Sequence, residues 1–232
     1  MATNTTVPVA NRIDPASTAI MFFDCSRGFL RPEDPAKKAV IDSTGVVPAM
    51  VRIERACRAA GIVIFYTKVD HRADHRDIKP IVADLGKDDM RGGPFYMEWT
   101  DDPPGPWTPN PSGSPIVEVL DDIAPQPGDY VIFKQRWSAF FETNFFLHLR
   151  RNAIDTLLLA GGRTEIGIAS TAYAARDHDF NIVVLRDAVL SPGRTDASDH
   201  LLDEIFPIFS RVMTTTEAAD LIAQEQPARR SA

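Results

Sequence analysis

The chain has 232 residues, of which 44% are hydrophobic and 25% are charged, a composition typical of a globular protein with a sizeable core. Its net charge is −7 and no basic cluster stands out, so neither nucleic acid nor a membrane surface is an expected partner. No apolar run approaches the roughly 20 residues of a membrane helix. The first residues lack a secretory leader pattern, and the two cysteines form no disulfide or zinc pattern. We therefore expect a cytoplasmic protein.

Apolar runs typical of buried parallel strands alternate with segments of helical periodicity. In chain order we expect a strand at residues 18–24, a helix at 46–60, a strand at 62–69, a short helix at 115–123, a strand at 130–134, a helix at 144–152, a strand at 156–161, a helix at 167–179, a strand at 181–188, a helix at 197–209, a strand at 211–215 and a helix at 216–224. This alternation predicts right-handed crossovers and a mostly parallel sheet covered by helices on both faces.

Residues 70–113 interrupt the alternation with a long segment rich in proline and glycine. A loop of that length inside a compact domain is usually functional, as a lid or as a subunit contact. Its aromatic residues Phe95, Trp99 and Trp107 are candidates for either role.

Three features lie where predicted strands end. Asp24 closes the first strand, Lys134 closes the third, and a glycine-containing turn, residues 161–167, leads from the fourth strand into a helix. Ligands of open α/β sheets bind beyond the carboxyl ends of the strands, where helix N-termini present backbone N–H groups. The sequence therefore predicts a site at this edge.

Four short patterns occur in order along the chain. They are DCSRGF with Asp24 and Phe29, KQRWSAFFET with Lys134, Arg136 and Phe140, GGRTEIGIASTA with Gly161, Thr164 and Gly167, and the triplet RDA at residues 186–188. Together they resemble the isochorismatase-like (cysteine hydrolase) superfamily. The resemblance implies a three-layer αβα domain with a six-stranded parallel sheet in the order 3-2-1-4-5-6. We expect one such domain over residues 1–232, with its core at about 16–224 and flexible tails.

The resemblance also implies roles for individual residues. Asp24 would be the general acid/base and Lys134 its electrostatic partner. The amides of Ile166 and Gly167 would form an oxyanion or substrate cradle at the helix start. The residues expected to contact substrate are Phe29, Arg136, Phe140, Arg163, Thr164 and Ile166. A cis peptide bond is expected at Gly162–Arg163 or Arg163–Thr164.

Gly167 departs from the usual family pattern, which has a nucleophilic cysteine at this position. The chain could be a cysteine amidohydrolase whose nucleophile has been replaced. Alternatively, glycine is native, as in true isochorismatases, where Asp protonates a vinyl ether and water attacks. A third interpretation gives the nucleophile's role to Ser170, Thr164 or Cys25, although Cys25 should point away from Asp24. In the fourth, the protein is a non-catalytic binder.

For function, the resemblance implies hydrolysis of a small organic molecule. The favoured parent activity is cleavage of an amide, ureide or carbamate, and vinyl ether hydrolysis is the alternative. No cofactor is expected, and a homo-oligomer, dimer or tetramer, is typical of the family. Nicotinamidases of the superfamily bind zinc through an Asp-x-His pair, whereas here Asp70 and His71 are adjacent. We therefore expect Asp70, His71, Asp74 and His75 to form a solvated charged loop without metal.

Overall fold

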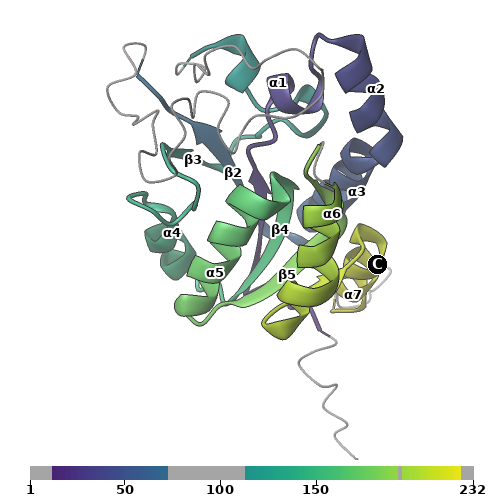
Figure 1. Ribbon diagram of the computed structural model, residues 1–232. Helices are drawn as coiled ribbons and strands as arrows, with labels where there is room; N and C mark the ends of the chain where they lie inside the picture. The colour runs from purple at the N-terminus through teal and green to yellow at the C-terminus, as the bar shows by residue number, and fades with distance from the viewer. Residues whose placement is uncertain (1–11, 73–112, 193–194, 226–232) are drawn as a thin grey trace, which may run out of the picture.

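The computed structural model describes residues 12–72, 113–192 and 195–225. Phe95, Trp99, Trp107, Asp74 and His75 lie outside these ranges. A parallel six-stranded sheet in the order β3-β2-β1-β4-β5-β6 forms the centre of the described part (Figure 1), as expected from the sequence. The strands are β1 (Thr18–Phe23), β2 (Val63–Val69), β3 (Tyr130–Lys134), β4 (Thr156–Gly162), β5 (Asn181–Leu190) and β6 (Arg211–Met213).

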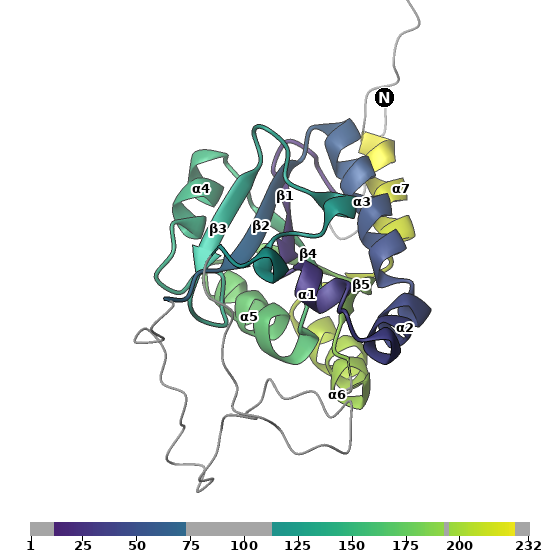
Figure 2. The same cartoon turned by 90° about the horizontal axis from the view of Figure 1, so that it is seen from above.

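Helices cover both faces of the sheet. They are α1 (Arg27–Leu30), α2 (Pro35–Thr44), α3 (Val46–Ala60), α4 (Phe145–Arg151), α5 (Ala169–Asp177), α6 (Thr195–His200) and α7 (Thr215–Glu225). Figure 2 shows α3 and α7 on one side of the sheet and α4, α5 and α6 on the other. Alternate residues of each strand supply the two layers, so that in β1 Ile20 and Phe22 pack under α3 whereas Met21 and Phe23 pack under α5.

Several elements differ from the expectation. Residues 115–123 form two separate 3-10 turns, η4 (Pro115–Val117) and η5 (Asp121–Ile123), rather than one helix. The helix expected at 167–179 starts earlier, with a π-helical turn, η6 (Thr164–Ile168). The helix expected at 197–209 is divided into α6, η7 (Leu201–Ile205) and η8 (Phe206–Ile208), which ends at the turn containing Pro207. The sequence patterns did not predict α1 and α2.

The RDA triplet has a structural explanation. Asp187 accepts hydrogen bonds from the backbone N–H of Thr215 at 2.7 Å and from its hydroxyl at 2.8 Å. Arg52 of α3 lies 3.4 Å from the same carboxylate. The triplet therefore ties the start of α7 to β5 and α3, in the manner of a side-chain helix cap.

The strand register places the predicted site residues at one edge of the sheet. Phe23, at the end of β1, pairs with Gly161 of β4, so Asp24 and Gly162 are the next residues on adjacent strands. Asp24 leaves the strand with a φ of 48°, in the left-handed region that non-glycine residues rarely adopt. The peptide bond Gly162–Arg163 is cis, at the first of the two positions expected. Among the described residues, no helix is long and apolar enough to cross a membrane.

Candidate active site

The Asp24 carboxylate is held by side chains from the two strands beyond it. Lys134 Nζ, at the end of β3, donates to Oδ2 at 2.7 Å. Thr67 Oγ1, on β2, donates to Oδ1 at 2.7 Å and accepts from the Asp24 backbone N–H at 2.8 Å. The Lys134 side chain is 6% exposed and that of Asp24 is 25% exposed. One carboxylate, fixed at both oxygens and still open to solvent, is thus presented at the edge of the sheet.

The Phe23 ring contacts both Lys134 and the turn that carries Gly167. Lys134 Nζ lies 4.5 Å from the centroid of the Phe23 ring, within the range of a cation–π contact. The same ring reaches Gly167: a Cβ built there would overlap Cε1 and would lie 2.6 Å from Cζ and 2.7 Å from Cδ1. Phe23 is 1% exposed, so the ring is enclosed. The space that a side chain at position 167 would need is therefore filled by Phe23.

The turn after β4 is fastened to the end of β5 and to α6. The Thr164 backbone N–H donates to Ser191 Oγ at 3.0 Å, and the Thr164 hydroxyl accepts from Ser198 at 3.0 Å. Arg163 Nε donates to Glu165 Oε1 at 2.9 Å, and the Ser191 hydroxyl donates to the other oxygen of Glu165. The fully buried Thr164 hydroxyl is therefore a structural link to α6 rather than the substrate contact or substitute nucleophile considered from the sequence.

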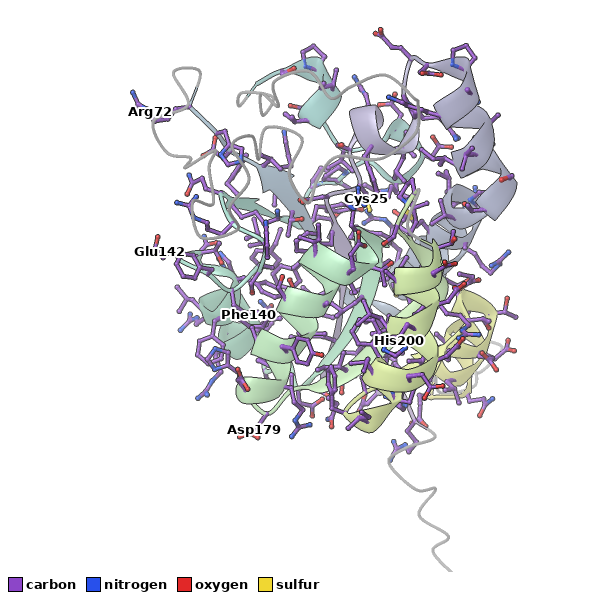
Figure 3. The ribbon with its side chains drawn as sticks, in the orientation of Figure 1. Cys25, Arg72, Phe140, Glu142, Asp179 and His200 are labelled. Atoms are coloured by element: carbon purple, nitrogen blue, oxygen red, sulfur yellow. The ribbon has the colours of Figure 1, made fainter. Side chains whose placement is uncertain are left out.

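Two further residues that were expected to contact substrate are engaged in other contacts. Phe140 belongs to an aromatic cluster with Phe145, Phe146, His178 and Phe180, at centroid distances of 4.8, 6.5, 5.4 and 6.1 Å. Figure 3 shows Phe140 on the flank beside α4 and α5, away from Cys25, the neighbour of Asp24. The Ile166 N–H donates to the Arg163 carbonyl at 3.2 Å, so this half of the expected amide cradle is already engaged within the turn.

The remaining candidates have different surroundings. The Phe29 ring lies against Gly162, because a Cβ at Gly162 would be 2.6 Å from its Cζ, and Phe29 therefore covers the strand end beside Asp24. Arg136 is exposed two residues after Lys134, and its Nη1 donates to the Gln135 carbonyl at 2.8 Å. Arg163 is buried, and its residue is 8% exposed.

Cys25 is an unsuitable substitute for the missing nucleophile. It is buried, and its Sγ lies 3.8 Å from the Met50 sulfur on the α3 side of the sheet. Burial, together with the charge of Asp24, raises the pKa of the thiol well above its usual range. The reactive thiolate is therefore disfavoured at this position.

Thr67, Glu165 and Ser191 were missed by the sequence analysis. The one available signal for Thr67 was a hydroxyl in the otherwise apolar run IVIFYT, a strand adjacent to Asp24. Glu165 and Ser191 have no local signal, because their contact joins two segments 26 residues apart. In the described part of the chain, no group of three histidine, cysteine, aspartate or glutamate side chains is arranged to hold a metal ion.

The parallel sheet and the Asp24–Lys134 pair at its carboxyl edge define an α/β protein with a candidate site at the ends of its strands. The particular family follows from sequence: a model described as the Isochorismatase domain matches residues 18–217. The chain therefore belongs to the isochorismatase family.

Individual relatives agree with this assignment. An N-carbamoylsarcosine amidase from Arthrobacter sp is 30% identical over 171 residues, which cover 74% of this chain and 58% of that protein. The uncharacterized isochorismatase family protein YwoC from Bacillus subtilis is 38% identical over 101 residues, covering 44% of this chain and 53% of its own length. The chain thus spans little more than half the length of these relatives. A solved isochorismatase family protein from Burkholderia thailandensis is 28% identical, with a TM-score of 0.69 and coverage of 91% of this chain and 98% of that chain.

Proposed function

We propose that this protein hydrolyses a small organic molecule without forming a covalent intermediate at position 167, and that Asp24 is its general acid/base. The observation that carries the proposal is the fit of the Phe23 ring against Gly167. A chain that had merely lost a cysteine would leave a hollow where the thiol had been. Here an enclosed aromatic ring fills that space, which supports glycine as the residue around which this site is built.

Hydrolysis of a vinyl ether is the reaction that suits such a site. The protonated Asp24 carboxyl gives its proton to the terminal carbon of the C=C–O group, which becomes an oxocarbenium ion. Water adds to the positive carbon and returns a proton to Asp24. The hemiketal then breaks its C–O bond to give a carbonyl compound and an alcohol, so the overall change is the addition of one water molecule.

Each contact of Asp24 has a function in this scheme. After proton donation the carboxylate is negative, and the Lys134 ammonium at 2.7 Å stabilises that charge in a largely buried setting. Thr67 fixes the orientation of the other oxygen. Fixed donors of this kind need not reorganise during the reaction, which is why they are effective in catalysis.

Cleavage of a C–N bond is the second candidate, favoured by the amidase among the relatives. In this scheme a thiol at position 167 would attack the carbonyl carbon, and Asp24 would pass the thiol proton to the leaving amine. Gly167 supplies no thiol, and a cysteine there would have to displace the Phe23 ring. C–N bond cleavage by this scheme would therefore need both a cysteine at position 167 and a Phe23 ring moved out of its way.

The test is a turnover assay on four proteins: the wild type, Asp24→Asn, Gly167→Cys, and Gly167→Cys combined with Phe23→Val. Substrates are isochorismate and a panel of small amides, ureides and carbamates, with product formation and ammonia release measured separately. We expect the wild type to hydrolyse isochorismate and Asp24→Asn to be slower by roughly 10²–10⁴-fold. Asp179→Asn, on a 94% exposed side chain, is the matched control and should keep full activity.

Two outcomes would overturn the proposal. Ammonia release by the cysteine variants alone would identify a C–N hydrolase without its nucleophile. Binding of panel compounds without turnover by any of the four proteins would identify a non-catalytic binder.

We also propose that the protein forms a homo-oligomer. Large apolar side chains are exposed on β3 and the segment that follows it, at Phe133, Phe141 and Leu147. β3 is an edge strand of the six-stranded sheet. Apolar groups gathered at a sheet edge are typical of contacts between subunits.

A further inference from the structure

Arg163 is a buried cation with unused hydrogen-bonding capacity. Its side chain is 8% exposed, yet among the described residues neither Nη1 nor Nη2 has a hydrogen-bond partner. Glu165 is on one side of the guanidinium: Nε donates to Oε1 at 2.9 Å, and Nη2 lies 2.9 Å from the same oxygen without the geometry of a hydrogen bond. The outer edge of the guanidinium, formed by the two Nη atoms, is therefore unsatisfied.

Such an arrangement is uncommon in folded proteins. Most buried polar groups have partners, because an unsatisfied buried donor loses its hydration without compensation. The Arg163 side chain is also prevented from turning to solvent, since Glu165 holds Nε and the Ser191 hydroxyl holds Glu165. The protein thus keeps two unsatisfied donors in place, which is the arrangement of a group awaiting a ligand.

The position of Arg163 relates it to Asp24. Phe23 pairs with Gly161 across β1 and β4, so Asp24 is one residue and Arg163 two residues beyond the last register pair. Phe29 lies against Gly162, the last residue of β4. Asp24 and Arg163 therefore lie at the same carboxyl edge of the sheet, after adjacent strands.

We propose that Arg163 is a specificity-determining residue that binds a carboxylate group of the substrate. The inference rests on the proposed function, because it takes the reacting atom to be at Asp24. A guanidinium presents parallel N–H donors that match the two oxygens of a carboxylate, and the pairing is stronger than a neutral hydrogen bond. Glu165 already neutralises one edge of Arg163, so the free edge selects a ligand by geometry as well as by charge.

The experiment compares benzoate with benzamide, a neutral molecule of nearly the same shape. Dissociation constants are measured by calorimetry for the wild type, Arg163→Gln and Arg163→Lys. We expect the wild type to prefer benzoate by about tenfold or more, and Arg163→Gln to lose that preference while its benzamide affinity stays within about twofold. Arg163→Lys keeps the charge without the fork and should show an intermediate preference.

Controls separate this proposal from the proposed function. Arg176→Gln removes an arginine whose side chain is 46% exposed and should leave the benzoate preference unchanged. Asp24→Asn should keep the preference for benzoate even where turnover is lost. The binding measurement therefore tests Arg163 whether or not Asp24 is the catalytic residue. Circular dichroism and thermal unfolding check that each variant is folded. Equal affinity for benzoate and benzamide in the wild type, or no measurable binding of either, overturns the proposal, as does an unchanged preference in folded Arg163→Gln.

Discussion

At the scale of single residues, two threonines in adjacent strands have opposite surroundings. Thr67 on β2 is 2% exposed, and its hydroxyl both donates to and accepts from Asp24. Thr18 on β1 is fully buried, and its hydroxyl has no hydrogen-bond partner in the described part of the chain. The two sites make a matched pair, because replacing either with the isosteric valine removes one hydroxyl from the same sheet.

We expect the two substitutions to change stability in opposite directions. Thr67→Val leaves the Asp24 N–H and one carboxylate oxygen without a partner, which costs about 1–3 kcal/mol of unfolding free energy. Thr18→Val removes a desolvated hydroxyl that has no compensating bond, and should be neutral or stabilising by about 1 kcal/mol. Urea denaturation measures both changes. Thr67→Val should also lower kcat, whereas Thr18→Val should leave it unchanged.

An equal loss of stability in both variants would contradict this assignment. It would mean that packing alone makes valine unfavourable at both positions, and that the hydrogen bonds between Thr67 and Asp24 add nothing to the free energy of unfolding. A stable Thr67→Val protein with full kcat would show that Lys134 alone is sufficient to orient the carboxylate.

At the scale of elements, the turn η6 packs against β1 through the contact of Gly167 with the Phe23 ring. Alanine in place of a helical glycine usually stabilises a protein by about 0.5–1 kcal/mol, because glycine loses more conformational freedom on folding. At position 167 the added Cβ would overlap the Phe23 ring. We therefore expect Gly167→Ala to destabilise the protein by about 1–3 kcal/mol, measured by urea denaturation.

A double-mutant cycle tests the origin of that loss. Phe23→Val removes most of the ring, and in that background Gly167→Ala should cost at least about 1 kcal/mol less than in the wild type. Ser170→Ala, one helical turn further on, is the control and should show no coupling to Phe23. Stabilisation by Gly167→Ala in the wild type would place the ring elsewhere and remove the main support for a native glycine.

The sequence predicted the elements that carry strong internal patterns. The strands at Thr18, Val63 and Tyr130 are apolar runs, and the α3 helix has a regular buried face closed by Gly61, so their bounds were nearly right. α1 and α2 were not predicted because α1 has only four residues and α2 buries only Ile41, which leaves almost no periodicity. Residues 115–123 were predicted to form one helix because proline at the first position favours an α-helix and a 3-10 turn alike.

The candidate site also has features that the sequence predicted and features that it did not. Asp24 and Lys134 were predicted to meet because both end parallel strands, and a 2.7 Å contact joins them. The fit of Phe23 against Gly167 was not predictable, because it depends on the rotamer of the Phe23 side chain and on where the turn η6 lies beside β1. Phe140 was misplaced for a related reason: a sequence motif gives position along the chain but not the direction of a side chain.

At the scale of the whole molecule, parallel strand direction separates two edges of the sheet. Asp24, Lys134 and Arg163 all lie at the carboxyl ends of strands. A hollow at the opposite edge is lined by arginines and aspartates of mixed sign, among them Arg12, Asp14 and Asp155. The candidate active site thus lies at one edge of the sheet, and we propose that the apolar side chains exposed around β3 contact a second copy of the chain.

The homo-oligomer proposal gives a prediction at this scale. Leu147 on α4 and Phe141 before it are exposed, and in a dimer or tetramer formed by this flank they would be buried. We expect light scattering at micromolar concentration to give a dimer or tetramer for the wild type, and Phe141→Glu with Leu147→Glu to shift it to monomer, because burying two carboxylates in an apolar contact is costly. Ile208→Glu, at a 78% exposed position on η8, is the matched control and should leave the assembly intact. A monomeric wild type would overturn the proposal, and an intact assembly in the double variant would move the interface away from this flank.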